Sequence, residues 1–379
     1  MADGGVGHVG GVRIPLNWSP STPTLSLRRK MGPGGANSSD DGPIIGAMGP
    51  EPQQRMPGAA GRTHPSRRRK GVTFRQRLAV LTLPAMAASS EGTIEVDDGY
   101  RVWYRRVGSG ERTPLLILHG GPGAGHDYLE TLDALADERP VIFYDQLGCG
   151  RSDKPDDPSR WHIGRFVREV DLVRQALGLS RIHLLGQSWG GWLAIEYMLG
   201  QPAGIDSLIL ASTSASIPQF VAECERLKSE LPPDVYATLQ KYEAAHDYRH
   251  PAYESAAEEF YKRHLCRLWP WPDPYLRTVR NLTNNQVYET MNGPNEFMVI
   301  GNLKTWDRIG RLSEIQARTL ITVGKYDELS PTCAETLRQG IAGSRAVQFE
   351  HSSHTAHLEE TDAYLAIIRA FLADVDAGR

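Results

Sequence analysis

The sequence predicts an α/β protein, with a mostly parallel sheet covered on both faces and a mainly helical cap inserted between two strands. Three observations predict this class. Short apolar runs rich in β-formers recur along the chain, helical patterns lie between several of them, and one long stretch interrupts the alternation. Strands that are apolar on both faces are typical of a parallel sheet buried between two layers of helices.

The predicted strands are short and continuous in their apolar character. They cover residues 115–118, 141–144, 182–185, 208–210, 320–323 and 347–349. A helix is predicted between the second and third of these, because Phe166, Val170 and Val173 recur at helical spacing. A less regular helical pattern, around Leu193 and Met198, follows the third strand.

The alternation stops between residues 216 and 312. This stretch is rich in Tyr, Trp, Glu and Arg, contains Pro-Trp-Pro at 270–272, and is expected to be mostly helical. An insertion of that length between two strands indicates a cap. We therefore expect the body to divide into a first core part at 92–215, the cap at 216–312, and a second core part at 313–379.

Residues 1–91 differ from the body in charge and composition. They hold 12 basic and 5 acidic residues, against 30 and 40 in the remainder, so the extension carries +7 and the body −10. The first seventy residues contain 13 Gly and 9 Pro without any apolar period, which predicts disorder. A basic cluster at 67–70 and an apolar stretch at 78–88 follow in the order of an export signal. Such a signal should begin a protein, so a natural start at Met86, a genuine signal and a functional tail remain as alternatives, with a cytoplasmic location expected and export as its alternative.

Several classes of function are excluded by composition. A body this acidic would repel nucleic-acid phosphates, and the chain has no run of 18 apolar residues that could cross a membrane. The four cysteines are 42 to 75 residues apart, which forms neither a CxxC metal motif nor a compact disulfide framework. We expect no nucleic-acid or membrane partner; the oligomeric state is not determined by the sequence.

The string Gly-Gln-Ser-Trp-Gly-Gly at 186–191 directly follows a predicted strand and opens a helix. This is the setting of a nucleophile elbow, a sharp strand-to-helix turn that exposes a serine oxygen at the helix N-terminus. Ser188 is therefore the candidate nucleophile.

A nucleophilic serine needs a base, and the base needs a carboxylate to orient it. Asp327 follows the strand at 320–323 and His354 follows the strand at 347–349, so both lie where open α/β sheets place their functional groups. The rival acids and bases are Glu328, Glu350, His351 and His357. A three-residue repeat of histidines in a loop is a weak metal signature, so neither a metal nor another cofactor is expected.

The Gly-rich string His-Gly-Gly-Pro-Gly at 119–123 follows the first predicted strand of the core. It matches no phosphate-binding pattern. We expect the backbone N–H of Gly121, together with that of Trp189 after the nucleophile, to form an oxyanion hole.

Together, five strings resemble the proline iminopeptidase (prolyl aminopeptidase) family of α/β-hydrolases, most closely its tricorn-interacting aminopeptidase branch. They are HGGPG (119–123), DQLGCGRSDKP (145–155), GQSWGG (186–191), MNGPNEF (291–297) and GKYDELSP (324–331). The resemblance extends over about residues 93–376. It implies the α/β-hydrolase fold and assigns nucleophile, acid and base to Ser188, Asp327 and His354.

The same resemblance implies that Gly121 and Trp189 are the oxyanion donors, and that Glu296 and Glu328 hold the free amino terminus of the substrate. The residues support the last point independently. Of the tandem carboxylates at 327 and 328 only one can orient the histidine, and a cleft with extra carboxylates would attract an ammonium group.

The function expected is that of a serine aminopeptidase that releases N-terminal residues, proline favoured, from short peptides through an acyl-enzyme. Its partners would be short peptides or aminoacyl amides with a free N-terminus. The alternatives are an amidase or esterase that acts on small amino-acid amides or esters, and a catalytically silent ligand-binding module. Dehalogenase or epoxide-hydrolase chemistry would require a carboxylate where Ser188 stands.

Overall fold

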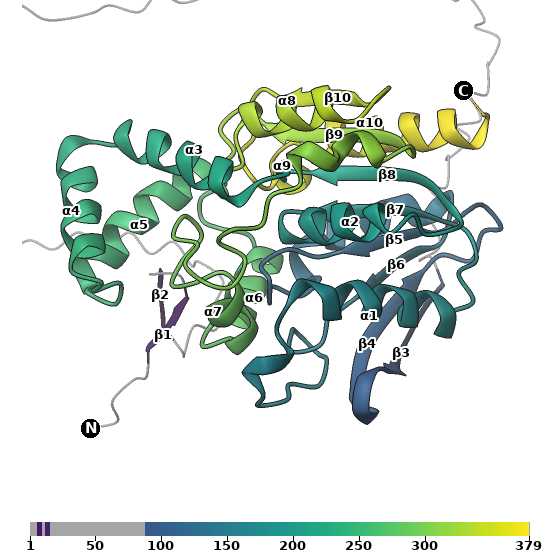
Figure 1. Cartoon of the computed structure of the whole chain (residues 1–379), viewed down its shortest axis with the longest axis horizontal. Helices are drawn as coiled ribbons and strands as arrows, with labels where there is room; N and C mark the ends of the chain where they lie inside the picture. Colours follow the sequence, from purple (N-terminus) through teal and green to yellow (C-terminus); the bar gives the residue numbers. More distant parts are fainter. Residues whose placement is uncertain (1–5, 10–11, 16–87, 379) are drawn as a thin grey trace, which may run out of the picture. The chain divides into compact units, whose positions relative to one another are not determined.

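An eight-stranded sheet organises the computed structural model, which describes residues 6–9, 12–15 and 88–378 (Figure 1). The strand order is β10-β9-β8-β7-β5-β6-β4-β3. The strands are β3 (Ser89–Glu95), β4 (Arg101–Val107), β5 (Leu115–Leu118), β6 (Val141–Tyr144), β7 (Ile182–Gln187), β8 (Ile205–Ala211), β9 (Arg318–Gly324) and β10 (Arg345–Phe349). Only the pairings β3–β4 and β4–β6 are antiparallel, so the prediction of a mostly parallel sheet is confirmed.

The central strands are buried on both faces because successive side chains enter two different cores. On β5, Leu116 and Leu118 pack in one core, and Leu115 and Ile117 pack in the opposite core. The first core is formed with α1 (Ile163–Ala176), α2 (Trp189–Leu199) and α8 (Pro331–Gly340), and the second with η2 (Asp127–Asp137) and α10 (Thr361–Asp376). This two-sided burial explains the continuous apolar runs in the sequence.

The segment between β8 and β9 is helical, as expected, and part of it lies to one side of the sheet (Figure 1). It contains α3 (Ile217–Ser229), α4 (Pro233–Ala244), α5 (Pro251–His264), α6 (Asp273–Leu282), α7 (Gln286–Met291) and η4 (Ile309–Glu314). Ser216 caps the start of this segment, since its side chain accepts the N–H of Gln219. The domain boundaries drawn from the sequence stay predictions.

The structure differs from the sequence-based expectation at the N-terminal side of the chain. Strands β3 and β4 were not predicted, and β3 begins at Ser89, inside the extension of residues 1–91. A short antiparallel pair, β1 (Val6–Val9) and β2 (Val12–Pro15), also lies in that extension. Of these strands only β1 and β2 fall within the first seventy residues, for which composition predicted disorder, and the assignment of residues 1–91 stays a prediction.

The other predictions for the extension concern residues outside the described part of the chain, including the basic cluster at 67–70 and the apolar residues 78–87. The true start, the export signal and the cytoplasmic location therefore stay predictions. In the described part of the chain, no helix is both long and apolar enough to cross a membrane.

Candidate active site

The candidate catalytic residues lie in loops at the carboxyl ends of three parallel strands. Ser188 follows β7, Asp327 follows β9 and His354 follows β10. In the sheet these three parallel strands lie within a run of four neighbouring strands, so their carboxyl ends meet at one edge. All three residues are buried, with exposed fractions of 1 to 8%.

Ser188 occupies the sharp turn that the sequence predicted. Its backbone has φ 57° and ψ −124°, a conformation that is uncommon for a residue with a side chain. The turn is held by the Ser188 N–H, which donates to Ala211 O at 3.0 Å, and by Thr213 Oγ1, which donates to Ser188 O at 2.9 Å. A Cβ at Gly190 would lie 2.1 Å from Leu118 O, so glycine is required for α2 to approach β5 this closely.

Asp327 and His354 form a hydrogen-bonded pair. His354 Nδ1 lies 2.8 Å from Asp327 Oδ1, an oxygen that also accepts the N–H of Leu329 at 2.9 Å. With Nδ1 as the donor to the carboxylate, Nε2 remains the basic nitrogen. Burial alone lowers the pKa of His354, but the charge and hydrogen bond of Asp327 outweigh it and raise this pKa above its ordinary value.

Ser188 and His354 line the same cavity. In the described part of the chain, Ser188 Oγ makes no hydrogen bond to the imidazole; His354 Nε2 instead lies 3.2 Å from Gln187 Nε2. The Gln187 amide also donates to His354 O at 3.2 Å, and its Oε1 accepts the Tyr128 hydroxyl. Catalytic hydrogen bonds often tighten only when substrate is bound, so this arrangement is compatible with His354 as the base of Ser188.

The two candidate oxyanion donors lie on either side of Ser188 in the fold. Gly121 has φ 108°, a conformation that favours glycine, and lines the cavity that also contains Ser188. Both backbone groups of its neighbour Gly120 are occupied, since the Gly120 N–H donates to the Tyr128 hydroxyl and Gly120 O accepts the Ala124 N–H. Within the described residues, the N–H groups of Gly121 and Trp189 have no acceptor, so both are available to a ligand.

The structure places Glu296 and Glu328 in the same buried environment. Glu296 is half-buried and lines the cavity with Ser188, and Glu328 is 1% exposed beside Asp327. Burial raises the pKa of Glu296, against the influence of His354 and the Tyr288 hydroxyl. Burial, followed by the negative charges of Glu296 and Asp327, raises the pKa of Glu328 well above its ordinary value.

No Lys or Arg of the described residues pairs with these two carboxylates. In the described part of the chain neither forms an ion pair with Lys or Arg, and Glu328 Oε2 has no hydrogen-bond partner. Buried carboxylates are normally paired or hydrogen-bonded. The pair therefore forms a site of negative potential that a cationic ligand could enter.

The apolar wall of the cavity comes from the segment between β8 and β9. The side chains that form it are Tyr261, Leu265, Trp271, Tyr275, Val279 and Leu282. The cavity has a volume of about 60 Å³. A small apolar group fits such a space.

The rival acids and bases lie elsewhere. Glu350 is exposed and pairs with Lys325 at 3.0 Å, and His351 is exposed. His357 is buried, its Nε2 lies 3.1 Å from Tyr128 O, and burial lowers its pKa to about 3. None of the three is hydrogen-bonded to Asp327 or His354 in the described part of the structure.

A different trio of residues could geometrically hold a metal ion. His126, Asp127 and Glu130 lie close together, but Arg277 from α6 already pairs with both carboxylates, at 2.6 Å to each. A guanidinium in that position supplies the positive charge that a metal would bring. This cluster therefore connects α6 to η2.

Sequence reasoning missed three residues that organise the site. Tyr128 and Gln187 form the hydrogen-bonded link described above. His264, at the end of α5, accepts the N–H groups of Glu328 at 3.2 Å and His354 at 3.3 Å through its carbonyl. Its ring Nδ1 lies 2.8 Å from Tyr326 O. Gln187 lies within the Gly-Gln-Ser-Trp-Gly-Gly string, whereas Tyr128 and His264 belong to no recognisable motif.

Comparisons with known proteins show the family of the chain. Residues 113–361 match the family model of the alpha/beta hydrolase fold. The chain is 43% identical over 293 residues to a proline iminopeptidase of Saccharolobus solfataricus, covering 75% of this chain and 94% of that protein. It is 38% identical to the crystal structures of a Mycobacterium smegmatis proline iminopeptidase (TM-score 0.72) and of VinJ (TM-score 0.73), each covering 76% of this chain and 99% of the other.

Proposed function

The chain belongs to the proline iminopeptidase family of α/β-hydrolases and is therefore an aminopeptidase hydrolase, and we propose that Ser188 is its nucleophile. The proposal depends above all on one observation: the elbow serine, a histidine paired with Asp327 and the carboxylate of Glu296 line one small cavity. The narrower assignment to the tricorn-interacting branch stays a prediction.

The proposed reaction begins with attack of Ser188 Oγ on the carbonyl carbon of the first residue of a peptide. His354 Nε2 accepts the serine proton and returns it to the leaving amine. Asp327 holds the imidazole in this tautomer and stabilises the imidazolium that forms. The N–H groups of Gly121 and Trp189 stabilise the tetrahedral oxyanion, a contribution of roughly 3 kcal/mol for each donor. Water then hydrolyses the acyl-enzyme by the same route.

Glu296 and Glu328 would bind the free amino terminus. A charge-assisted hydrogen bond to a carboxylate contributes roughly 1.5–3 kcal/mol, and the substrate ammonium would supply a positive charge that no Lys or Arg of the described residues brings to this pair. Binding of the amino terminus would place the first peptide bond at Ser188, and this requirement distinguishes an exopeptidase from a general amidase.

The lining of the cavity supports a preference for proline. Its walls are aromatic and aliphatic, which suits three methylene groups.

The alternative, an amidase or esterase on small amino-acid amides or esters, would use the same triad without the amine anchor. Prolyl p-nitroanilide with a free and with an acetylated nitrogen separates the two. Two ammonium contacts predict a preference for the free substrate of about 10²- to 10⁴-fold in kcat/KM. Equal rates on the two substrates would favour the amidase.

The nucleophile is tested by Ser188→Ala. We expect kcat to fall by at least about 10⁴-fold, with the remaining activity due to the oxyanion hole and substrate binding. A fluorophosphonate should label Ser188 in the wild-type protein, as located by peptide mass spectrometry. Labelling at another residue, or near-normal turnover by the alanine variant, would remove the assignment.

A further inference from the structure

We propose that Gln146 is a positioning residue that sets the separation between the two arms of the oxyanion hole. The inference rests on the proposed nucleophilic role of Ser188 but not on the identity of the substrate. Gln146 lies in the loop that follows β6 and is completely buried. It is distant in sequence from both of the loops that it joins.

The Gln146 side chain is hydrogen-bonded to both arms. Its Nε2 donates to His119 O at 3.1 Å, on the loop that leads to Gly121. Its Oε1 accepts the indole N–H of Trp189 at 2.8 Å, and the backbone N–H of that same tryptophan is the second oxyanion donor. One planar amide therefore connects Trp189 to the loop that carries Gly121, and the backbone N–H groups of these two residues must converge on a single oxygen.

A second contact orients the His119 arm. The Gln146 N–H donates to His119 Nε2 at 3.0 Å, so Nε2 must be an acceptor and Nδ1 carries the proton. That Nδ1 lies 2.9 Å from Gly120 O, on the residue before the oxyanion glycine. Burial lowers the pKa of His119, which keeps the ring neutral and preserves both hydrogen bonds.

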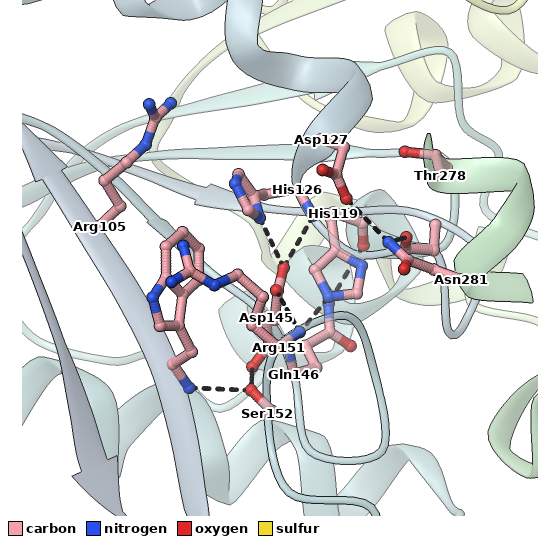
Figure 2. Close-up of polar contacts among 12 residues, drawn as sticks. Arg105, His119, His126, Asp127, Asp145, Gln146, Arg151, Ser152, Thr278 and Asn281 are labelled. Carbon is pink, nitrogen blue, oxygen red and sulfur yellow. Dashed lines mark hydrogen bonds and ion pairs between the residues drawn. The ribbon is translucent and has the colours of Figure 1, made fainter. Parts of the chain in front are cut away.

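The backbone that carries Gln146 is itself firmly held, as Figure 2 shows. Asp145 Oδ1 accepts the His126 N–H and Oδ2 accepts the Arg151 N–H, both at 2.8 Å. The Ser152 hydroxyl donates to Asp145 O. A side chain can fix the distance between two loops only if its own backbone is fixed, and these contacts meet that requirement.

Other contacts hold each arm separately. The Gly120 N–H donates to the Tyr128 hydroxyl, and the Trp189 ring packs edge-on against Phe166 and Trp192. Removing the Gln146 amide should therefore leave both arms folded but free to move relative to one another. Displacement of a catalytic group by about 1 Å can cost about 10²-fold in rate.

The test compares Gln146→Met with Ser214→Ala. Methionine has nearly the same length but cannot bridge the arms. Ser214 Oγ accepts the indole N–H of Trp192 at 3.1 Å, so its loss removes a buried indole partner on the same helix without touching the oxyanion loops. Both variants should lower the melting temperature or the midpoint of urea unfolding.

Three rates are then measured: phosphonylation of Ser188 by a fluorophosphonate, hydrolysis of p-nitrophenyl acetate and hydrolysis of prolyl p-nitroanilide. Gln146→Met should lower all three rates by about 10- to 100-fold. For the two hydrolyses the loss should lie in kcat, with KM changed less than about twofold. Ser214→Ala should leave the rates within about twofold of wild type.

Equal losses in the two variants, or normal phosphonylation by Gln146→Met, would show that Gln146 only supports packing. If Gln146→Met fails to fold, Trp189→Phe provides the test, because it retains the backbone N–H and removes the indole N–H together with part of the ring. It should lower phosphonylation in the same way, and unchanged phosphonylation would overturn the proposal. A wild-type protein that hydrolyses the ester but not the prolyl substrate would contradict the proposed function, while the ester and phosphonylation rates would still test Gln146.

Discussion

Asp145 and Glu328 are two buried carboxylates that both follow strands at the carboxyl end of the sheet, but they differ in their hydrogen-bond partners. Asp145 follows β6 and accepts the N–H and the ring Nδ1 of His126 and the N–H of Arg151, all within 2.9 Å. Glu328 follows β9, and one of its oxygens has no partner in the described part of the chain. Both are almost inaccessible to water.

The contrast appears in their acidity. Burial alone raises the pKa of Asp145, but hydrogen bonding and the proximity of histidines outweigh it and lower this pKa below its ordinary value. Glu328 receives no such compensation, so burial raises its pKa. A carboxylate whose hydrogen bonds are complete supports structure. A buried carboxylate whose hydrogen bonds are incomplete is a candidate functional group, and this difference separates the two regions of the site.

The largest expected effect comes from Asp145→Ala. This change leaves the donors of His126 and Arg151 buried without an acceptor, so the free energy of unfolding should fall by about 3–5 kcal/mol. Urea denaturation monitored by tryptophan fluorescence measures it. Glu328→Gln should cost far less, because it removes an uncompensated charge. Equal losses in the two variants would erase the distinction drawn between them.

The next effect concerns substrate. Glu296→Gln and Glu328→Gln should each lower kcat/KM for prolyl p-nitroanilide by about tenfold or more, because each removes a charged contact to the ammonium group. Hydrolysis of p-nitrophenyl acetate, which has no amine, should hardly change. Glu296→Gln is the cleaner probe, since Glu328 also influences Asp327 and its loop. A parallel loss of ester hydrolysis in Glu296→Gln would indicate a structural role for that residue.

The smallest effect is a difference in pH dependence. The pKa of Glu328 is raised on folding, so its contribution to stability is complete below about pH 4.5 and is lost as pH rises through the folded-state pKa. The pKa of Asp145 is lowered, so its contribution is present above about pH 3.8 and is lost as pH falls through the folded-state value.

Unfolding free energies measured from pH 5 to 8 should therefore decline more for wild type than for Glu328→Gln. A steeper decline in the glutamine variant would contradict the assigned direction. The Asp145 contribution should appear only on the acid side, as a loss of stability below pH 4.

Much of the fold could be predicted because its signals are local. The runs at 115–118 and 141–144 became β5 and β6, and the helical period around Phe166 became α1. Strand β3 escaped prediction because its residues Ser89–Glu95 are mostly polar, and its pairing with β4 is made by the backbone. An edge strand of this kind has no apolar period to detect.

The sequence by itself predicted six of the eight strands of the sheet, the elbow around Ser188 and the loops that carry Asp327 and His354, because propensity, apolar period and turn chemistry act over neighbouring residues. Only the tertiary structure decided that Asp327, rather than Glu350, contacts His354, and that Gln146 joins His119 to Trp189. These contacts connect residues 27 to 43 positions apart. Their distances depend on how whole strands and helices pack, and that packing is a property of the assembled core that no short stretch of sequence contains.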